Sequence, residues 1–305
     1  MKHFLITGSS GFIGSNLSNF FELSGHRVTR LDLREGSDIQ SDLREIDWSL
    51  VDLSSYDGVV HLAAKISVPE SFEVPEIYYE VNVESTRRLF ASCVNAGVPR
   101  IAFASSAAVY GDVEGSVMKI GWEGAPLSPY AESKLEGERI AKELSTDDTK
   151  ITCFRFFNVY GPGQSHKGQY ASVIPLFVNK MIEQKKITIY GSGDQTRDFI
   201  HVDDISKVLL NSFFVESEPF SVYNLGSGTG VTINSLYRSI AKIIRNYSIE
   251  VRDPIYAIER KGDIEHSVAD VSDTIQKFPN LITTQLTEGL TDMVGKILDG
   301  RDVVP

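Results

Sequence analysis

Short apolar runs alternate with amphipathic stretches along the first part of the chain. Residues 3–7 form an apolar run that ends in a glycine turn, after which apolar side chains recur at helical spacing. Further apolar runs typical of buried strands occupy residues 27–31, 59–64, 101–104 and 151–156, and helical stretches occupy residues 76–95 and 129–144. Strands that alternate with helices predict an α/β protein with a doubly wound parallel sheet.

The pattern changes where a Gly-Pro-Gly cluster interrupts it at residues 161–163. Shorter helical and extended stretches follow, and the apolar run at residues 222–226 is typical of a last sheet strand. We therefore predict a main domain and a smaller, interleaved C-terminal region that covers the ends of the strands. The main domain comprises residues 1–161, to which residues 199–226 return, and the smaller region comprises residues 162–198 and 227–305.

The turn after the first strand is rich in glycine. Because glycine has no Cβ, the backbone at Gly8, Gly11 and Gly14 can approach a pyrophosphate and turn the helix N-terminus towards it. Asp32 ends the second predicted strand, where a carboxylate binds ribose hydroxyls and repels a 2′-phosphate. This arrangement predicts a Rossmann sheet that binds NAD, although the neighbouring Arg34 leaves NADP open.

Other residues complete the predicted cofactor site. Asp42 and Leu43 either border the adenine or belong to a solvated loop, and Ala63 and Ala64 either form a thin pocket wall or pack in the core. The predicted cofactor-binding residues are Gly8, Gly11, Phe12, Ile13, Gly14, Asp32, Asp42, Leu43, Leu62, Ala63, Ala64, Tyr130 and Lys134.

Tyr130 and Lys134 are spaced so that they share one face of a helix. The phenol has a reference pKa of ~10, and we expect Lys134 and the positive nicotinamide ring to lower this pKa. Ser106 follows a buried strand and can hydrogen-bond the same substrate oxygen. On its own this spacing is more often an exposed helix, but together with the glycine turn it predicts oxidation of an alcohol, with Ser106, Tyr130 and Lys134 as catalytic residues.

The composition of the chain is informative mainly through the partners and sites that it argues against. The chain has 305 residues and a formal net charge of -11, which disfavours nucleic acids and anionic membranes as partners. An apolar run of roughly 18 residues, as a membrane span requires, does not occur, and the first residues enter a strand without a secretory segment, so we expect a cytoplasmic protein. Cys93 and Cys153 lack metal-ligand spacing, which predicts buried thiols and no metal site.

Together these segments resemble the extended short-chain dehydrogenase/reductase family, and most of all its nucleotide-sugar epimerases of the UDP-glucose 4-epimerase type. The resemblance is carried by residues 7–14, 61–64, 105–111, 130–134, 155–162, 196–204, 224–228 and 260–263. It implies NAD as the cofactor, a UDP-sugar as the substrate, and a homodimer that packs the helices at residues 76–95 and 129–144. Val83, Leu89 and Phe90 face either the sheet or this partner.

The resemblance also assigns the substrate-binding residues. By position, Ser106 rather than Ser105 binds the sugar. Lys167 follows a histidine in a segment that resembles ADP-heptose 6-epimerases, so it is either a second acid/base or a lysine of the substrate lid. By the same resemblance, Asn158, Arg197 and Arg260 would bind the diphosphate, and Ile189 and Tyr190 would lie beside the base. Ser67 would lie near the sugar, and Ser267 would lie at the sugar's 2-substituent.

Two positions discriminate between the activities of the family. Its dehydratases carry an acidic pair, and its decarboxylases a glutamate, just after the catalytic serine or threonine, where this chain has Ala107 and Ala108. The resemblance then implies 4-epimerisation through a transient 4-keto sugar, on UDP-glucose and UDP-galactose. Because Ser267 is small, the N-acetylated pair of UDP-sugars is expected as well. The alternatives are another nucleotide-sugar epimerase or ketoreductase, and a non-catalytic NAD sensor.

Overall fold

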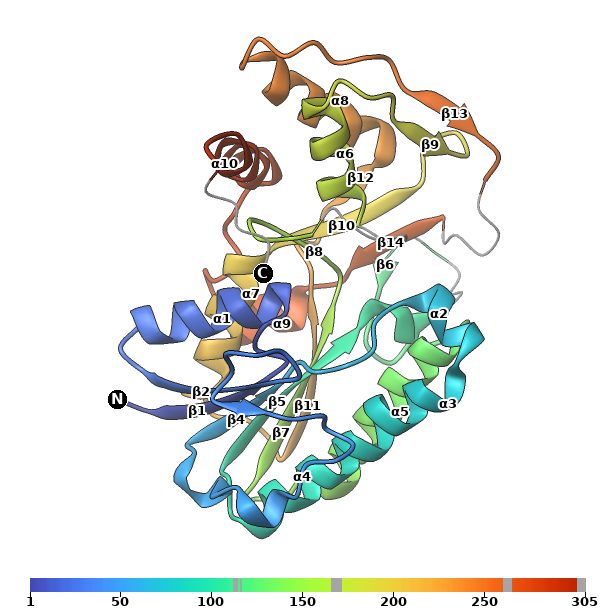
Figure 1. The fold of residues 1–305 in the computed structure, drawn as a ribbon. Helices are drawn as coiled ribbons and strands as arrows, with labels where there is room; N and C mark the ends of the chain where they lie inside the picture. Colours follow the sequence, from blue (N-terminus) through green and yellow to red (C-terminus); the bar gives the residue numbers. More distant parts are fainter. Residues whose placement is uncertain (112–114, 116, 166–171, 260–264, 301–305) are drawn as a thin grey trace.

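The computed structural model describes residues 1–111, 115, 117–165, 172–259 and 265–300. It confirms the α/β fold class, with a large parallel sheet that has helices on both faces (Figure 1). The strands of this main sheet are β1 (His3–Thr7), β2 (Arg27–Asp32), β3 (Ile39–Gln40), β4 (Gly58–His61), β5 (Arg100–Ser106), β7 (Lys150–Phe156) and β11 (Phe220–Leu225). They follow the order β11-β7-β5-β4-β1-β2-β3, and each neighbouring pair is parallel.

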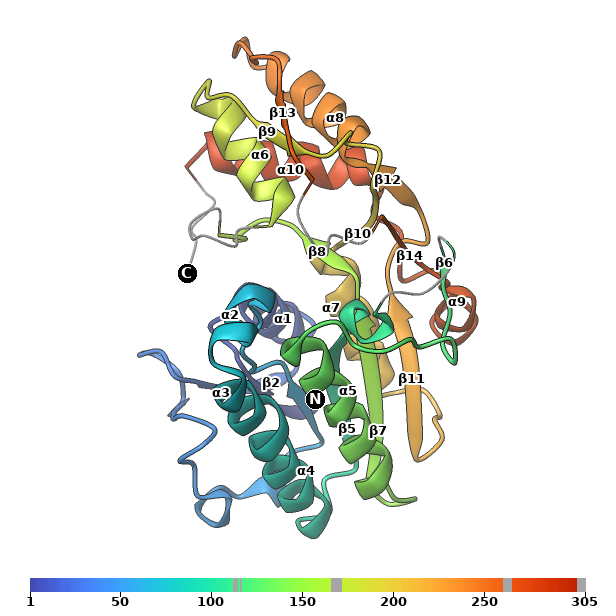
Figure 2. The ribbon, with the colours of Figure 1, turned by 90° about the vertical axis from the view of Figure 1, so that its right-hand side faces the viewer.

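Helices bury both faces of the main sheet. One face is covered by α1 (Phe12–Leu23), α7 (Val202–Ser212) and α9 (Ser272–Lys277), and the other by α4 (Ser85–Asn95) and α5 (Pro129–Leu144) (Figures 1 and 2). Side chains of a strand alternate between the two cores: Phe4 and Ile6 pack towards α1, whereas Leu5 packs towards α4. A sheet buried on both sides needs continuously apolar strands, which explains the uninterrupted apolar runs in the sequence.

The helix predicted at residues 76–95 is interrupted in the structure. After α2 (Val68–Glu73), the chain forms α3 (Pro75–Tyr79) and a π-helical turn (Glu80–Glu84) before α4 begins. Such turns are rare and occur frequently at functional sites. The side chains of Val83, Leu89 and Phe90 are at most 2% exposed and belong to the core under α4, so the alternative that they face a partner is wrong.

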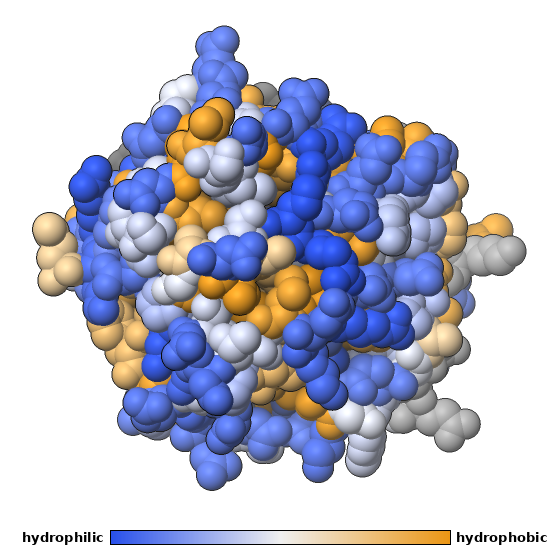
Figure 3. Space-filling model, turned by 90° about the horizontal axis from the view of Figure 1, so that it is seen from below, coloured by the Kyte–Doolittle hydropathy of each residue, from blue (hydrophilic) through white to orange (hydrophobic). Residues whose placement is uncertain are grey.

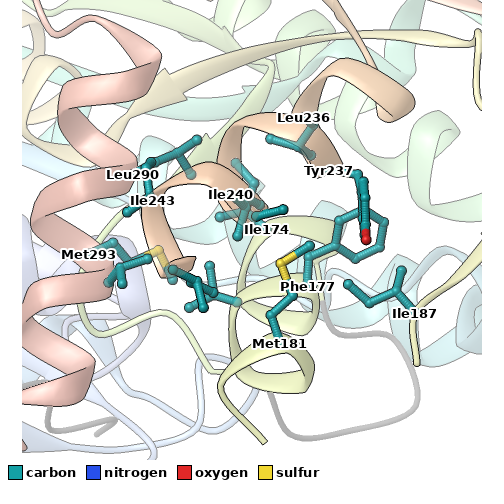
Figure 4. Close-up of a cluster of buried hydrophobic side chains, with 14 of the residues drawn as sticks. Ile174, Phe177, Met181, Ile187, Leu236, Tyr237, Ile240, Ile243, Leu290 and Met293 are labelled. Carbon is teal, nitrogen blue, oxygen red and sulfur yellow. The ribbon is translucent and has the colours of Figure 1, made fainter. Parts of the chain in front are cut away.

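The C-terminal region has a core of its own. Helices α6 (Val173–Ile182), α8 (Ile233–Arg245) and α10 (Leu286–Leu298) surround it, and Figure 4 shows Phe177, Ile240 and Met293 pointing into it. A second sheet lies between this core and the main sheet (Figure 2). Its strands are β12 (Gly230–Thr232), β10 (Thr196–His201), β14 (His266–Ala269) and β6 (Val117–Met118), and β8 (Asn158–Tyr160) also pairs with β10. A separate two-stranded sheet is formed by β9 (Thr188–Tyr190) and β13 (Ile255–Ala257).

The face of the molecule seen from below is mostly hydrophilic, with hydrophobic side chains gathered in patches between the polar ones (Figure 3). No helix in the described part of the chain has the length and apolar character needed to cross a membrane. Cys93 and Cys153 are buried free thiols, as the sequence predicts.

Gly137 marks a close approach of α5 to the main sheet, because a Cβ there would lie 2.6 Å from Cζ of Phe103. We predict that Gly137→Ala lowers the free energy of unfolding by about 1–3 kcal/mol through overpacking. This loss should outweigh the gain in helix propensity of about 1 kcal/mol. The matched control is Gly295→Ala in α10, where the nearest atom to a Cβ is Tyr247 Oη at 3.4 Å. Urea unfolding should show this control to be neutral or stabilising; a stabilised Gly137→Ala would contradict the prediction.

Candidate active site

The glycine-rich turn lies at the carboxyl end of β1, in the middle region of the main sheet. Gly8 has a φ of +70°, and a Cβ there would lie 2.7 Å from the backbone nitrogen of Ala63. A Cβ at Gly14 would lie 2.1 Å from the Gly8 carbonyl oxygen. Gly11 is the N-cap of α1 and has no side chain to fill the space before the first helical turn. The turn thus presents bare backbone and a helix N-terminus, which fits a pyrophosphate.

Asp32 is the last residue of β2, and its carboxylate lies against the glycine-rich turn. Its Oδ2 accepts a hydrogen bond from the backbone nitrogen of Ser10 at 2.9 Å, and its Oδ1 accepts one from that of Arg34 at 3.1 Å. Each oxygen keeps a further lone pair, which fits the two hydroxyls of a ribose. The guanidinium of Arg34 donates to the carbonyl oxygen of Ser10 at 2.8 Å and therefore lies at the same turn.

The other predicted cofactor residues fall into two groups. Phe12 and Ile13 at the start of α1, and Leu62, Ala63 and Ala64 just after β4, all lie at the same edge of the sheet. Asp42 pairs with Arg44 at 2.7 Å, and the hydrogen bond between them lowers the pKa of Asp42. Leu43 is 5% exposed and packs in the core under α4, which favours a structural role for its side chain.

His61, the last residue of β4, lies in a buried chain of hydrogen bonds beneath this edge. Thr86 donates its hydroxyl proton to the carbonyl oxygen of Asn82 at 2.7 Å, so its oxygen accepts from Nε2–H of His61 at 2.9 Å. Nδ1 of His61 is then unprotonated and accepts from the Thr7 hydroxyl at 2.7 Å. The Thr7 oxygen in turn accepts from the backbone nitrogen of Ala63 at 3.2 Å. This chain fixes the ends of β1 and β4 on either side of the glycine-rich turn.

Ser106, Tyr130 and Lys134 meet at the carboxyl end of β5. Ser106 is the last residue of that strand, and its Oγ accepts from the backbone nitrogen of Ala108 at 3.2 Å. Ser106 lies close enough to Tyr130 to oppose the rise in the pKa of the phenol. The ammonium of Lys134 donates to the carbonyl oxygen of Ala104 at 2.8 Å, which attaches α5 to β5. The structure therefore brings the three predicted catalytic residues together.

The local sequence places Tyr130 in the first turn of α5. Ser128 is the N-cap and accepts from the backbone nitrogen of Ala131 at 3.1 Å, and a proline occupies the first helical position. Ser133 donates to the carbonyl oxygen of Tyr130 at 2.7 Å and accepts from Nδ2 of Asn82 at 2.9 Å. The backbone of Tyr130 is therefore connected to the π-helical turn.

Burial shifts the pKa values of both Lys134 and Tyr130 in α5. It lowers the pKa of Lys134 to about 8, so the amine is mostly protonated at pH 7. It raises the pKa of Tyr130, and Ser106 only opposes that rise. Desolvation of the phenolate is the largest effect that the protein itself exerts on this pKa, so the expected lowering by Lys134 and the nicotinamide ring stays a prediction.

Ser67 lies beside the catalytic helix. It is the N-cap of α2, and its carbonyl oxygen accepts from the hydroxyl of Tyr78 at 2.6 Å. The ring of Tyr78 stands edge-on to that of Tyr130, with centroids 6.5 Å apart. The same Tyr78 hydroxyl lies 2.9 Å from Glu70 Oε2 and shares its one proton between the two acceptors, so the segment before α2 has a defined place next to the phenol.

The second sheet holds the predicted diphosphate residues that the structure describes. Asn158 on β8 donates Nδ2 to the carbonyl oxygen of Asp198 at 2.9 Å. Arg197 on β10 donates Nη1 to the carbonyl oxygen of Thr196 at 2.8 Å. Because β8 and β10 are paired in parallel, Asn158 and Arg197 come from neighbouring strands.

Ser267 is the register partner of Arg197 across β10 and β14. Its side chain is buried, and Oγ lies 3.6 Å from Sδ of Met118. Met118 belongs to a small buried cluster against which Ala107 packs. Since Ala107 directly follows Ser106, this cluster links Ser267 to the catalytic end of β5.

The remaining predicted substrate residues are Ile189, Tyr190, Lys167 and Arg260. Ile189 on β9 is 1% exposed and contributes its side chain to the core of the C-terminal region. The carbonyl oxygen of Tyr190 accepts from Nε2 of Gln195 at 2.9 Å. Lys167 and Arg260 lie outside the described residues. Within the part of the chain that the structure describes, no three His, Cys, Asp or Glu side chains are grouped to hold a metal ion.

A buried charged cluster, which the sequence patterns did not predict, lies behind Ser106. Glu138 of α5 and Arg155 of β7 form an ion pair at 2.7 Å, and Glu123 pairs with the same guanidinium. The available signal was the position of Arg155 inside an otherwise apolar strand, because a charge there has to be paired.

Comparison with known proteins identifies the class. Residues 4–226 match the NAD dependent epimerase/dehydratase family, so the chain belongs to this family and its cofactor is NAD, which the glycine-rich turn and Asp32 fit. The resemblance to nucleotide-sugar epimerases of the UDP-glucose 4-epimerase type is confirmed. A UDP-glucose 4-epimerase of Yersinia enterocolitica is 30% identical over 296 residues, which cover 85% of this chain and 87% of that protein.

Two solved structures are similar over almost the whole chain. The UDP-N-acetylglucosamine 4-epimerase of Methanobrevibacter ruminantium M1, in complex with UDP-N-acetylmuramic acid, has a TM-score of 0.90 and 31% identity, covering 98% of this chain and 99% of that one. MoeE5 in complex with UDP-glucose and NAD has a TM-score of 0.87 and 33% identity, with the same coverage.

The neutral state of His61 predicts a pH-dependent stability. Burial lowers its pKa from 6.5 to about 3, so below pH 6.5 the unfolded chain takes up a proton that the folded protein does not. The free energy of unfolding should therefore fall as the pH is lowered from 7.5 to 5.5, by about 1.4 kcal/mol from this residue. His61→Gln keeps one donor and one acceptor but does not titrate. Urea unfolding at both pH values should show the smaller loss in His61→Gln; equal losses would contradict the prediction.

Proposed function

We propose that this protein is an NAD-dependent 4-epimerase of UDP-sugars. One observation carries the proposal: Ser106, Tyr130 and Lys134 come together at the same sheet edge as the glycine-rich turn, while Ala107 and Ala108 follow Ser106. An acid at these two positions would be needed to eliminate water or carbon dioxide by the routes that related enzymes use. With alanine there, an oxidised sugar is returned to an alcohol, and the net reaction is inversion at carbon 4.

Each catalytic side chain has its own task in this proposal. Bound NAD supplies reversible hydride transfer. Tyr130 takes the proton of the 4-hydroxyl during oxidation and returns it during reduction, and Ser106 hydrogen-bonds the same oxygen. Lys134 lies one helical turn from Tyr130 and brings positive charge to this end of α5. Because burial alone raises the pKa of Tyr130, such a charge is required to favour the phenolate.

The substrate residues support a UDP-sugar as the ligand. Asn158 and Arg197 come from paired strands at the base of the C-terminal region, and we assign them to the diphosphate. By the family resemblance, we also assign Arg260 to the diphosphate and Lys167 to the surroundings of the sugar. The diphosphate does not change during the reaction, so these residues contribute binding to the substrate and the transition state alike.

We further propose a cytoplasmic homodimer that packs the helical segment at residues 76–95 and α5 against their copies in a partner. Within this segment α4 lies beside α5, and an ion pair between Arg87 and Glu143 at 2.9 Å joins them. Exposed side chains such as Tyr79 are available for the contact. The support for this assembly is the family resemblance.

The direct test is stereochemical. We predict that the protein interconverts UDP-glucose and UDP-galactose without consuming added NADH, as proton NMR of the sugar products will show. Tyr130→Phe removes one oxygen and should lower turnover by about 10²–10⁴-fold, the usual effect of losing general acid–base catalysis. Bound NAD, released by denaturation and identified, should be unchanged in this variant. Near-wild-type turnover by Tyr130→Phe would place the base elsewhere.

A second prediction concerns the size of the sugar. Ser267 is small, so we expect UDP-N-acetylglucosamine and UDP-N-acetylgalactosamine to be interconverted as well. Ser267→Tyr should suppress turnover of the N-acetylated pair and spare the plain hexoses, whereas the control Ser267→Ala should turn over both pairs. Equal loss of both pairs in Ser267→Tyr, or no loss of either, would show that this position does not limit the pocket.

A further inference from the structure

Arg155 is a charged side chain in the middle of the protein. It lies on β7, where it is the register partner of Ser105, and it is 3% exposed. Its Nε donates to Glu138 Oε1 at 2.9 Å and its Nη2 to Glu138 Oε2 at 2.7 Å. This paired geometry is the one that a guanidinium and a carboxylate prefer. Glu138, which is 4% exposed, lies on α5 one turn beyond Lys134.

The remaining nitrogen of the Arg155 guanidinium, Nη1, contacts the chain on the N-terminal side of Tyr130. Nη1 of Arg155 donates to Glu123, which lies in the loop that leads into α5. Glu123 also accepts from the backbone nitrogen of Gly121 at 3.0 Å. The face of Arg155 lies 4.8 Å from the ring centroid of Tyr110. One side chain therefore binds the chain both before and after Tyr130.

The same cluster extends to the strand that carries Ser106. Ser105 donates its hydroxyl to Glu138 Oε1 at 2.5 Å, and Lys134 donates to Ala104. These two bonds attach successive residues of β5 to successive turns of α5 (Figure 2). The relative position of Ser106 and Tyr130 is therefore set by contacts behind the site.

Stability alone does not account for this cluster. Taking an arginine and a carboxylate out of water costs several kcal/mol per ion, and well-packed apolar residues are often as stabilising as a buried ion pair. What an ion pair adds is a defined geometry, because the fork of the guanidinium fits two carboxylates in fixed directions.

We propose that Arg155 is a positioning residue for the reaction: by binding Glu123 and Glu138, it holds the segment that carries Tyr130 and Lys134 in register with Ser106. This inference rests on the proposed function, in which Tyr130 and Ser106 act on the same sugar oxygen. A displacement of about 1 Å at such a site can cost about 100-fold in rate. Loosening the segment should therefore lower kcat, while KM for the UDP-sugar stays within about twofold.

Glu123 offers the mildest way to test the proposal, since it is partly exposed and its removal leaves the Arg155–Glu138 pair intact. Glu123→Ala should lower kcat by about tenfold to 100-fold and speed amide hydrogen exchange in residues 125–133, with bound NAD retained. Glu123→Gln keeps an acceptor for Arg155 and should restore most of kcat. The control Glu22→Ala removes a carboxylate that pairs with Arg30 at 2.7 Å near the C-terminal end of α1, away from α5, and it should change neither kcat nor exchange in residues 125–133.

The outcomes separate the two hypotheses. Unchanged kcat in Glu123→Ala, a rise in KM alone, or equal losses in Glu123→Ala and Glu22→Ala would overturn the positioning role. If the wild-type protein turns over no nucleotide sugar, the proposed function fails, and hydrogen exchange then decides the structural claim by itself. Faster exchange in Glu123→Ala but not in Glu22→Ala supports it, and unchanged exchange overturns it. Arg155→Lys, which keeps the charge but not the fork, should reproduce the loss of kcat if it folds.

Discussion

The contact between α5 and β5 is the constraint on which the rest of the site depends. Gly137 allows the helix to approach the ring of Phe103, and at this distance the ammonium of Lys134 reaches the carbonyl oxygen of Ala104. A buried ammonium has to find an acceptor, so this bond also fixes the helix along the strand. Tyr130 and Ser106 are carried by this helix and this strand, and their separation follows from the packing between them.

Much of the fold could be predicted from short-range patterns. Mostly apolar runs such as residues 3–7 and 151–156 are typical of a sheet buried on both faces, and both became strands of the main sheet. The π-helical turn could not be predicted in this way. It places Asn82 where its side chain meets Lys65 and Ser133, and residues so far apart in sequence leave no periodic signal.

The candidate active site shows the same difference between features that depend on residues close in sequence and features that depend on distant ones. The glycine-rich turn and the pair Tyr130 and Lys134 each depend on residues close in sequence, so their spacing indicates their role. Glu123 and Arg155 meet only when the strands and the catalytic helix have assembled. The charge of the phenol is also a tertiary property, because its pKa depends on how deeply folding buries it.

The main sheet is completed by a strand from late in the chain. β11 pairs with β7 from Phe220 opposite Ile151 to Leu225 opposite Phe156, and the residues between these strands build part of the C-terminal region. During synthesis β7 therefore remains an unpaired, apolar edge until residue 225 has left the ribosome. Such an edge can pair with other chains, so the growing polypeptide is most exposed to aggregation during this interval. The main sheet is consequently completed only after part of the C-terminal region has been synthesised.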